Sequence, residues 1–368
     1  MKRALGRRLA AVTQVLVLGL AGAVATTVTP AAAAAAPGTV VQSTAATLPP
    51  ELTSLATAKR IRYVSTDPSG ASIFATGLVL TPTTGRTNRT VVWAHGTTGL
   101  ADQCTPSTNQ EVFWPEARVA IAALLHKGWT VTAPDYPGLG TVQQHPYLVG
   151  NSEARSIIDS VKAARNLDPA LTTQYAVDGH SQGGQGALFA GQIAPAYDGN
   201  LVLKSVAAIA PASNLDFIAE IIPGTPGQGY LVMAMHGIKA IDPTFDPAAY
   251  LAPAARLRQV VLLTGCLYEI LDAYAPLSAT QLVPGGVVPE AVQAKLEQYG
   301  NPGRAPASAP ILIVQGTADE AVPEFITDML VAQLGSSVEY RKLAGETHDS
   351  AVIVSAGDVA SWIAARFS

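Results

Sequence analysis

The sequence predicts an α/β fold, in which helices cover both faces of a mostly parallel β-sheet. Short apolar runs alternate with amphipathic helical patterns along most of the chain, and continuous apolar runs are typical of parallel strands buried on both faces. One such run leads into a Gly-x-Ser-x-Gly turn at residues 179–183, and a helical pattern of small residues follows it. Residues 213–309 interrupt the alternation and indicate a structured insertion, because long unstructured loops are uncommon in compact domains.

The composition indicates a large folded unit. Of the 368 residues, 48% are hydrophobic and 14% are charged. This composition can bury a sizeable core, and it excludes the disordered class, which has few large apolar residues. We expect an α/β core formed by residues 37–212 and 310–368, with residues 213–309 inserted between its two parts.

The first 36 residues have the pattern of a secretory signal peptide. Four basic residues precede an apolar run at 9–25, and the alanine tract 31–36 supplies small residues for cleavage. A membrane anchor is the alternative, but Thr13 and Gln14 interrupt an apolar run that is already shorter than the about 20 residues of a span. We therefore expect the protein to be exported.

Cleavage would leave an acidic protein. The first 36 residues hold four of the 23 Lys and Arg residues and none of the 27 Asp and Glu residues, so the net charge changes from −4 to −8. No basic cluster remains in the mature sequence, which argues against nucleic acid and anionic membrane surfaces as partners.

The first elements after the signal peptide are expected at one edge of the sheet. Residues 37–60 are small and polar and predict an N-terminal arm. Residues 61–65 and 72–80 are strand-like on either side of a Pro-Ser-Gly turn and predict an antiparallel hairpin. The apolar run 90–94 predicts the next strand.

The rest of the core alternates helices and strands. The helical patterns repeat apolar residues every three or four positions, whereas the strand patterns are short and almost wholly apolar. The predicted helices are 113–127, 152–166, 323–334 and 350–366, and the predicted strands are 129–134, 174–178, 203–210, 311–314 and 338–343.

The insertion is apolar, rich in Pro and Gly, and helical in places. Its helical patterns are 215–222, 254–263 and 289–299. Because it is inserted between two core strands, we expect a mainly helical cap over the C-terminal edge of the sheet.

The turn at residues 179–183 is a candidate nucleophile site. Gly179 and Gly183 flank Ser181, and their missing Cβ atoms let the strand and the helix approach closely. Ser181 would then lie at a helix N-terminus, where free N–H groups and the helix dipole favour an oxyanion. A structural glycine-rich turn has the same pattern, so the interpretation depends on partners later in the chain.

A serine nucleophile needs a base and an acid. Asp319 follows the strand 311–314, and His348 follows the last predicted strand. The order Ser181, Asp319, His348 is that of α/β-hydrolase triads. His348 would take the serine proton and return it to the leaving alkoxide, while Asp319 would fix the histidine tautomer and stabilise the imidazolium.

Other residues of the sequence are alternatives for the acid or for the base. The alternative acids are Glu320 and Asp328, and the alternative bases are His145 and His236. His180 is adjacent to the nucleophile, but we expect its side chain to point away across the strand.

The oxyanion would need two N–H donors. The backbone N–H of Gln182, directly after the nucleophile, is expected to supply one of them. Thr97 or Thr98, in the glycine-containing loop after strand 90–94, is expected to supply the other. An ordinary strand-to-helix turn is the alternative for this loop.

Two cysteines, Cys104 and Cys266, remain for an exported protein. An even pair in this setting predicts a disulfide, and two free buried thiols are the alternative. The bond would close a loop of 163 residues, which corresponds to about 5 kcal/mol in the chain-entropy model. No histidine spacing accompanies the cysteines in the way a zinc site requires.

These motifs together resemble the secretory lipase family, the lipase A type of the α/β-hydrolase superfamily. The elbow and the acid loop are common to many hydrolases, whereas the stretches that begin at Cys104 and Pro134 are more particular. The matching stretches are 93–99 (WAHGTTG), 104–107 (CTPS), 134–140 (PDYPGLG), 179–184 (GHSQGG), 316–319 (GTAD) and 347–348 (TH).

The resemblance implies a secreted carboxylic ester hydrolase that acts on acylglycerols or simpler esters, with a helical cap after the sixth core strand. It implies a small ester or lipid as the partner and neither a cofactor nor a metal. An apolar cap favours a greasy acyl group and is compatible with transient contact with a lipid–water interface.

Two other functions remain open. The first is an exported serine peptidase or acyltransferase on the same fold, and a peptidase selective for an N-terminal amine would need clustered carboxylates in the cap. The acidic residues available there are Glu220, Asp242, Asp246, Glu269 and Asp272. The second is a non-catalytic envelope or binding protein whose hydrolase fold has lost its activity. The intact Ser, Asp and His argue against it.

Overall fold

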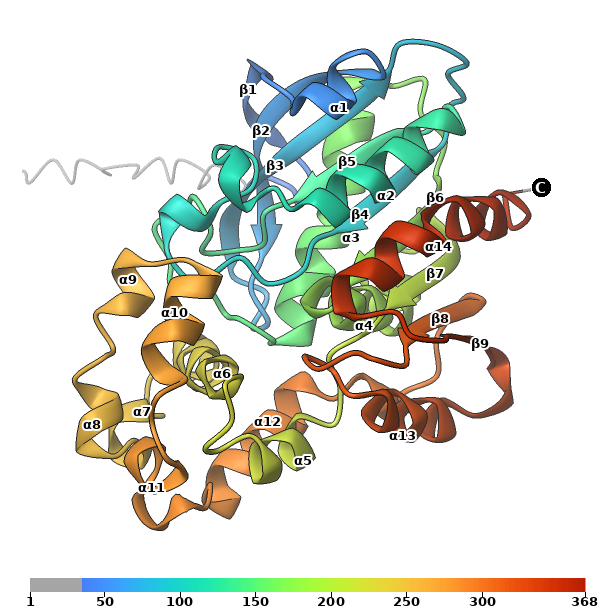
Figure 1. Ribbon diagram of the computed structural model, residues 1–368. Helices are drawn as coiled ribbons and strands as arrows, with labels where there is room; N and C mark the ends of the chain where they lie inside the picture. Colours follow the sequence, from blue (N-terminus) through green and yellow to red (C-terminus); the bar gives the residue numbers. More distant parts are fainter. Residues whose placement is uncertain (1–34, 368) are drawn as a thin grey trace, which may run out of the picture. The chain divides into compact units, whose positions relative to one another are not determined.

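The computed structural model describes residues 35–367, so nearly all of the predicted signal peptide lies outside the described residues. The fold is built on a nine-stranded sheet with the order β1-β2-β3-β5-β4-β6-β7-β8-β9 (Figure 1). The strands are β1 (Val40–Ala46), β2 (Ala56–Thr66), β3 (Ser72–Pro82), β4 (Thr90–Ala94), β5 (Thr130–Pro134), β6 (Gln174–His180), β7 (Val202–Ile209), β8 (Ile311–Gly316) and β9 (Val338–Leu343).

The sheet is mostly parallel, as predicted. The six strands β4 to β9 pair in parallel, whereas β1, β2 and β3 add an antiparallel edge next to β5. The predicted hairpin is formed by β2 and β3, with Thr66 paired to Ser72 across the turn. Because β4, β6, β8 and β9 run in one direction, the loops that follow them meet at the same edge.

The prediction of an N-terminal arm at residues 37–60 is wrong. This stretch holds β1, the short helix α1 (Pro50–Thr53) and the beginning of β2. The five central side chains of β1 are exposed, so the strand has no apolar alternation that the sequence could reveal. Its backbone pairing with β2 at the sheet edge stabilises it instead.

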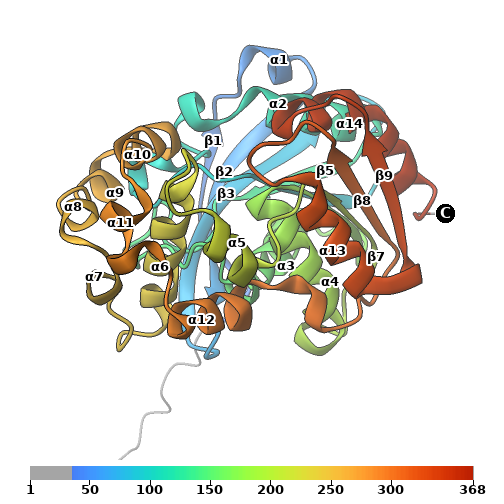
Figure 2. The same cartoon turned by 60° about the horizontal axis from the view of Figure 1, so that its bottom comes forward.

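Two helical layers cover the sheet (Figure 2). Helices α2 and α14 pack on one face around Trp93 and Ile209, and α3, α4 and α13 pack on the other face around Val177 and Ile313. Alternate residues of a strand point to opposite faces, which is why a single strand such as β4 contributes to both cores. These core helices are α2 (Pro115–His126), α3 (Gly150–Leu167), α4 (Gln182–Tyr197), α13 (Glu324–Leu334) and α14 (His348–Ala364).

The segment between β7 and β8 is helical and has its own apolar cluster, which includes Val232, Ile270 and Val292. The patterns at 215–222 and 289–299 match α5 and α12, but the pattern at 254–263 is broken into α8 and α9. Its helices are α5 (Leu215–Ile221), α6 (Gln228–Ile241), α7 (Pro247–Tyr250), α8 (Pro253–Arg256), α9 (Val261–Thr264), α10 (Leu267–Tyr274), α11 (Ala279–Leu282) and α12 (Glu290–Gly300). None of the helices within residues 35–367 combines the length and apolar character needed to cross a membrane.

A disulfide joins Cys104 to Cys266, which confirms the predicted pairing. Cys104 ends a short 3₁₀ turn after β4, and Cys266 directly precedes α10. The N–H of Leu267 donates to the carbonyl oxygen of Thr98 at 2.9 Å. The bond therefore fastens the helical segment to the loop that follows β4.

Candidate functional site

Ser181 lies at the sharp turn between β6 and α4. Its backbone has φ 56° and ψ −117°, a conformation that costs a non-glycine residue free energy. A Cβ on Gly179 would overlap the carbonyl oxygen of Gly183, and a Cβ on Gly183 would overlap that of Ala94. The two glycines are thus required for the close approach of β6, α4 and β4 around the serine.

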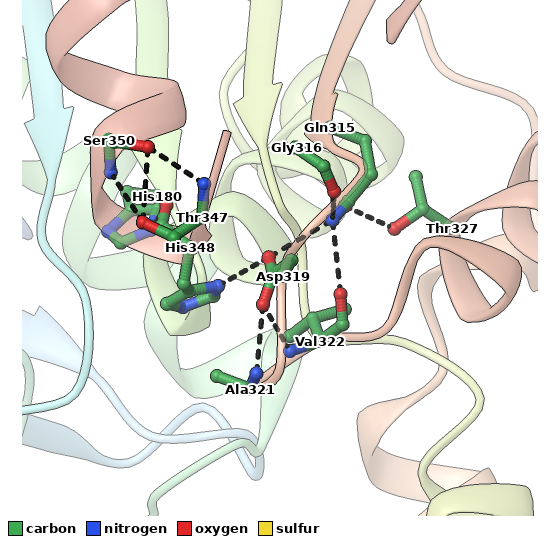
Figure 3. A network of polar contacts seen from close by, with 10 residues as sticks. All are labelled: His180, Gln315, Gly316, Asp319, Ala321, Val322, Thr327, Thr347, His348 and Ser350. Carbon is green, nitrogen blue, oxygen red and sulfur yellow. Dashed lines mark hydrogen bonds and ion pairs between the residues drawn. The ribbon is translucent and has the colours of Figure 1, made fainter. Parts of the chain in front are cut away.

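Asp319 and His348 form a hydrogen-bonded pair (Figure 3). His348 Nδ1 lies 2.7 Å from Asp319 Oδ2, and the Asp319 side chain has no exposed surface. Asp319 Oδ1 accepts the backbone N–H groups of Ala321 and Val322, while Oδ2 also accepts from Gln315 Nε2 at 3.0 Å. Because these donors fix the carboxylate, it can hold Nδ1 protonated and leave His348 Nε2 free to accept a proton.

Gln315 was not predicted from the sequence. Its side-chain oxygen accepts from Thr327 Oγ1 at 2.7 Å, and its amide nitrogen donates to Asp319. The side chain is buried at the end of β8. The sequence did offer one signal, because Gln315 is a polar residue directly after the apolar strand 311–314. A buried amide needs hydrogen-bond partners, so its position indicated a polar contact there.

His348 is the first residue of α14, where Thr347 and Ser350 cap the helix. His180, directly before Ser181, bonds through Nε2 to the carbonyl oxygen of His348 at 3.1 Å, and the two rings lie 4.4 Å apart. We expected His180 to point away from the site, but this contact places it against the predicted base. The bond ties the start of α14 to the elbow.

No hydrogen bond joins the Ser181 hydroxyl to His348 within the described part of the chain. Both residues nevertheless follow strands of the same parallel set, and His180 brings the His348 backbone to the residue next to Ser181. In enzymes without substrate, hydrogen bonds of the catalytic groups are often long and tighten only in the complex.

The loop after β4 lies against the elbow. A Cβ on Gly96 would be 3.6 Å from the Cβ of Ser181 and 3.2 Å from the His180 ring. Gln182 is the first residue of α4, so its N–H has no acceptor within the helix. Thr97 is buried next to Gly96. The two predicted sources of oxyanion donors therefore flank Ser181.

The alternative bases are occupied elsewhere. His145 is fully buried with Nδ1 2.7 Å from the carbonyl oxygen of Pro137, and His236 lies on α6 beside Gln259. Burial lowers the pKa of both histidines to about 4. Neither shares a hydrogen bond with an acid among the described residues.

The alternative acids also lie away from His348. Asp328 forms hydrogen bonds with Lys342 and Tyr340 at the outer side of β9, and Glu320 is exposed. Asp319 is the acid whose carboxylate forms a hydrogen bond with His348.

A mostly apolar pocket opens at Ser181. Ile218, Leu231 and Leu296 line it from α5, α6 and α12 of the helical segment, and Val322 lines it from the loop after β8. The pocket therefore joins the serine to the apolar cluster of residues 213–309.

Two carboxyl groups lie close to His348. Burial, and to a smaller extent the negative charge of Asp349, raise the pKa of Glu116, on α2, to about 7. Asp349 follows His348 at the start of α14, where the helix dipole favours an acid.

The side chains of His180, His348 and Asp349 form a group with the chemistry of metal ligands, since one ligand atom of each lies within 4.8 Å of the others. His348 Nδ1 is bonded to Asp319 and His180 Nε2 to a carbonyl oxygen. Each ring therefore has one nitrogen left, and partners of this kind orient ligating histidines in metal sites as well as the base of a proton-transfer site.

Known proteins that are similar to this chain include one curated relative and two solved structures. The secreted triacylglycerol lipase LIP7 of Malassezia globosa is 26% identical over 317 residues, which cover 79% of this chain and 66% of the relative. Lipase A of Candida antarctica has a TM-score of 0.71 at 18% identity, covering 85% of this chain and 78% of that chain. The rice cell wall degrading esterase LipA of Xanthomonas oryzae has a TM-score of 0.73 at 18% identity, covering 90% and 98%.

The structural similarities establish an α/β-hydrolase fold. The chain spans about two thirds or less of the length of the first curated relatives it matches. A model of the family described as secretory lipase matches residues 115–368, which is more than half of the chain and includes Ser181, Asp319 and His348. The chain therefore belongs to the secretory lipase family.

Proposed function

We propose that this protein is a secreted serine hydrolase that cleaves carboxylic esters, with Ser181 as the nucleophile, His348 as the base and Asp319 as the acid. The observation that carries the proposal is the 2.7 Å bond between His348 and the buried Asp319. His348 begins α14, and the hydrogen bond from His180 joins this helix to the strained turn at Ser181. A structural glycine-rich turn would not need this pair.

The reaction proceeds in two halves. His348 Nε2 removes the hydroxyl proton as Ser181 Oγ attacks the ester carbonyl carbon, giving a tetrahedral oxyanion. The bond from carbon to the alcohol oxygen then breaks, and His348 returns the proton to the leaving alkoxide. Water adds to the acyl-enzyme with His348 again as base, and the carboxylic acid leaves with Ser181 restored.

The negative charge that develops on the carbonyl oxygen needs fixed donors. Gln182 follows Ser181 directly, and Gly96, next to Thr97, lies beside the Ser181 side chain, so the N–H groups of Gln182 and Thr97 serve this role in the proposal. Donors that are already in place cost no reorganisation when the charge appears, which makes them a large part of the rate enhancement.

The pocket indicates the substrate. Apart from Ser181, Tyr147 and Tyr230, its lining is aliphatic, so it suits the acyl chain of an ester better than a charged group. The name of the Malassezia globosa relative includes triacylglycerol lipase. We therefore propose acylglycerols or simpler fatty esters as substrates, with residues 213–309 acting as the cap that binds the acyl chain.

Export is part of the same proposal. The first 36 residues have the signal pattern, the Malassezia globosa relative is named as secreted, and the Cys104–Cys266 disulfide suits an oxidising compartment.

A peptidase that binds an N-terminal amine is less well supported. Asp242 pairs with Lys295, Asp246 lies near Lys239, and Glu269 caps its own helix. These three acids of the helical segment are engaged separately and are not gathered into the carboxylate cluster that an amine would require.

The test is hydrolysis of p-nitrophenyl esters from acetyl to palmitoyl by the mature protein, by Ser181→Ala and by a control, Ser361→Ala, on the exposed side of α14. We expect the wild type and the control to hydrolyse these esters and Ser181→Ala to lose at least about 10³-fold in kcat. No hydrolysis at any chain length by the folded wild type would contradict the proposal.

A further inference from the structure

A short segment before and at the start of α3, residues 145–153, contacts both residues proposed as oxyanion donors. Glu153 is fully buried, and its Oε1 accepts from Gln182 Nε2 at 2.8 Å and from the N–H of Leu148 at 3.1 Å. A buried carboxyl in this position holds the side chain of Gln182, whose backbone N–H begins α4.

His145 holds the same amide from a second side. Its Nδ1 must carry the proton, because its 2.7 Å partner is the carbonyl oxygen of Pro137, which can only accept. Its Nε2 is then an acceptor, 3.2 Å from Gln182 Nε2. Glu153 and His145 together take both hydrogens of the Gln182 amide, so this side chain has a single orientation.

Tyr147, in the same segment, reaches the other proposed donor. Its hydroxyl lies 2.8 Å from Thr97 Oγ1, and Trp114 Nε1 donates to the Thr97 carbonyl oxygen at 3.1 Å. Leu148, the residue after Tyr147, donates its N–H to the Glu153 carboxyl. Tyr147 is therefore linked to Glu153 through the backbone of Leu148. Two buried sets of hydrogen bonds, joined covalently by the chain at Tyr147 and Leu148, thus lie on the two sides of the proposed oxyanion site.

We propose that Glu153 and Tyr147 are positioning residues that aim the N–H groups of Gln182 and Thr97 at the oxyanion, with His145 completing the hold on Gln182. This inference rests on the proposed ester hydrolysis. Tyr147 also lines the pocket at Ser181, but in this role each residue acts through the donor it holds. Oxyanion donors are effective only within a narrow range of distance and angle, and a shift of about 1 Å can cost on the order of 10²-fold in rate.

The protonation of Glu153 fits this role. Burial raises its pKa to about 8, and its Oε2 has no hydrogen-bond partner among the described residues. A neutral carboxyl places no negative charge next to the site where the oxyanion forms. The charged or polar groups that face it are Gln182, His145, Tyr136 and Tyr147.

The experiment compares Glu153→Gln, Glu153→Leu and Tyr147→Phe. Glutamine keeps an oxygen that accepts from Gln182 and Leu148, leucine has a similar volume without it, and phenylalanine removes only the hydroxyl. We expect Glu153→Leu and Tyr147→Phe to lower kcat for p-nitrophenyl esters by about 10- to 100-fold with KM changed less than about threefold. Glu153→Gln is expected to keep at least about a third of the wild-type kcat.

A second readout does not depend on the choice of substrate. The rate at which a fluorophosphonate labels Ser181 requires the same stabilised oxygen, and we expect it to fall in parallel with kcat. The melting temperature is recorded for each variant. Equal losses in Glu153→Gln and Glu153→Leu would mean that the hydrogen bond is not what matters, and unchanged labelling of Glu153→Leu and Tyr147→Phe would overturn the inference.

These outcomes separate the inference from the proposed function. A wild type that hydrolyses esters and is labelled, with both variants equally active, refutes only the positioning role. A folded wild type that neither hydrolyses esters nor reacts with the fluorophosphonate refutes the ester hydrolase itself, and the positioning role with it.

Discussion

At the scale of single residues, the site depends on how Asp319 is held. Three donors converge on its carboxylate before His348 adds a fourth contact. Such a carboxylate is fixed in one orientation, and only that orientation presents Oδ2 to the histidine.

We predict that Asp319→Asn lowers kcat by about 10³- to 10⁴-fold with little change in KM, because an amide facing His348 stabilises the wrong tautomer. The matched control is Asp328→Asn, whose carboxyl is bonded to Lys342 and Tyr340 instead. It should retain kcat within about twofold. Steady-state kinetics on a single ester suffices, and a larger loss in Asp328→Asn than in Asp319→Asn would reverse the assignment.

The sequence indicated Ser181, Asp319 and His348 because the chemistry of each role restricts the residue type and the chain order. It did not indicate Gln315 or His180, whose roles depend on contacts between residues distant in the chain. A hydrogen bond from His180 to a backbone carbonyl has no signature in residue type, so only the fold reveals it. The expectation that His180 points away failed for this reason.

At the scale of elements, α4 packs closely under the elbow. A side chain at Gly183 would overlap the backbone of β4, whereas Gly199, just after α4, has open space around it. Backbone atoms cannot move aside as a flexible side chain can, so the helix would have to shift.

We predict that Gly183→Ala lowers the free energy of unfolding by at least about 2 kcal/mol and lowers kcat more than tenfold, because α4 carries both Ser181 and the Gln182 N–H. Gly199→Ala should change each quantity little. Urea denaturation and ester hydrolysis measure the two effects. Full stability and full activity in Gly183→Ala would show that α4 does not pack as described.

Most core elements were predictable to within a few residues, because buried parallel strands are apolar throughout and the helices between them are amphipathic. The exceptions have physical reasons. The side chains of β1 are mostly exposed, so its stability comes from backbone pairing. The pattern at 254–263 is divided between α8 and α9, because the turn between them bonds N–H groups to carbonyl oxygens three positions back, as from Arg258 to Ala255 and from Val261 to Arg258. Tertiary contacts decide such breaks.

At the scale of the whole molecule, the Cys104–Cys266 bond connects the core to the helical segment across 162 positions of the sequence. A long loop of this kind loses much conformational freedom when it is closed. The stability of the folded protein should therefore depend strongly on this bond.

We predict that replacing both cysteines by serine lowers the free energy of unfolding by up to about 5 kcal/mol. Urea denaturation of the double variant measures the loss, and reduced wild type, denatured in the same way, is the control. The reduced wild type and the variant should agree, since both lack the bond. An oxidised wild type no more stable than the variant would contradict this account.

The same bond also restricts how the helical segment can move. The chain enters the segment at Leu215 and leaves it at Asn301, and these two residues are bonded to each other, so both covalent passages lie at one place. A segment joined to the core only there could rotate away from it as one body. The Cys104–Cys266 bond restricts such a rotation, because Cys266 lies well inside the segment and is fixed to the core. The segment is therefore held to the core at Leu215 and Asn301 and again at Cys266, and reduction would remove the covalent tie at Cys266 but not the hydrogen bond from Leu267 to Thr98.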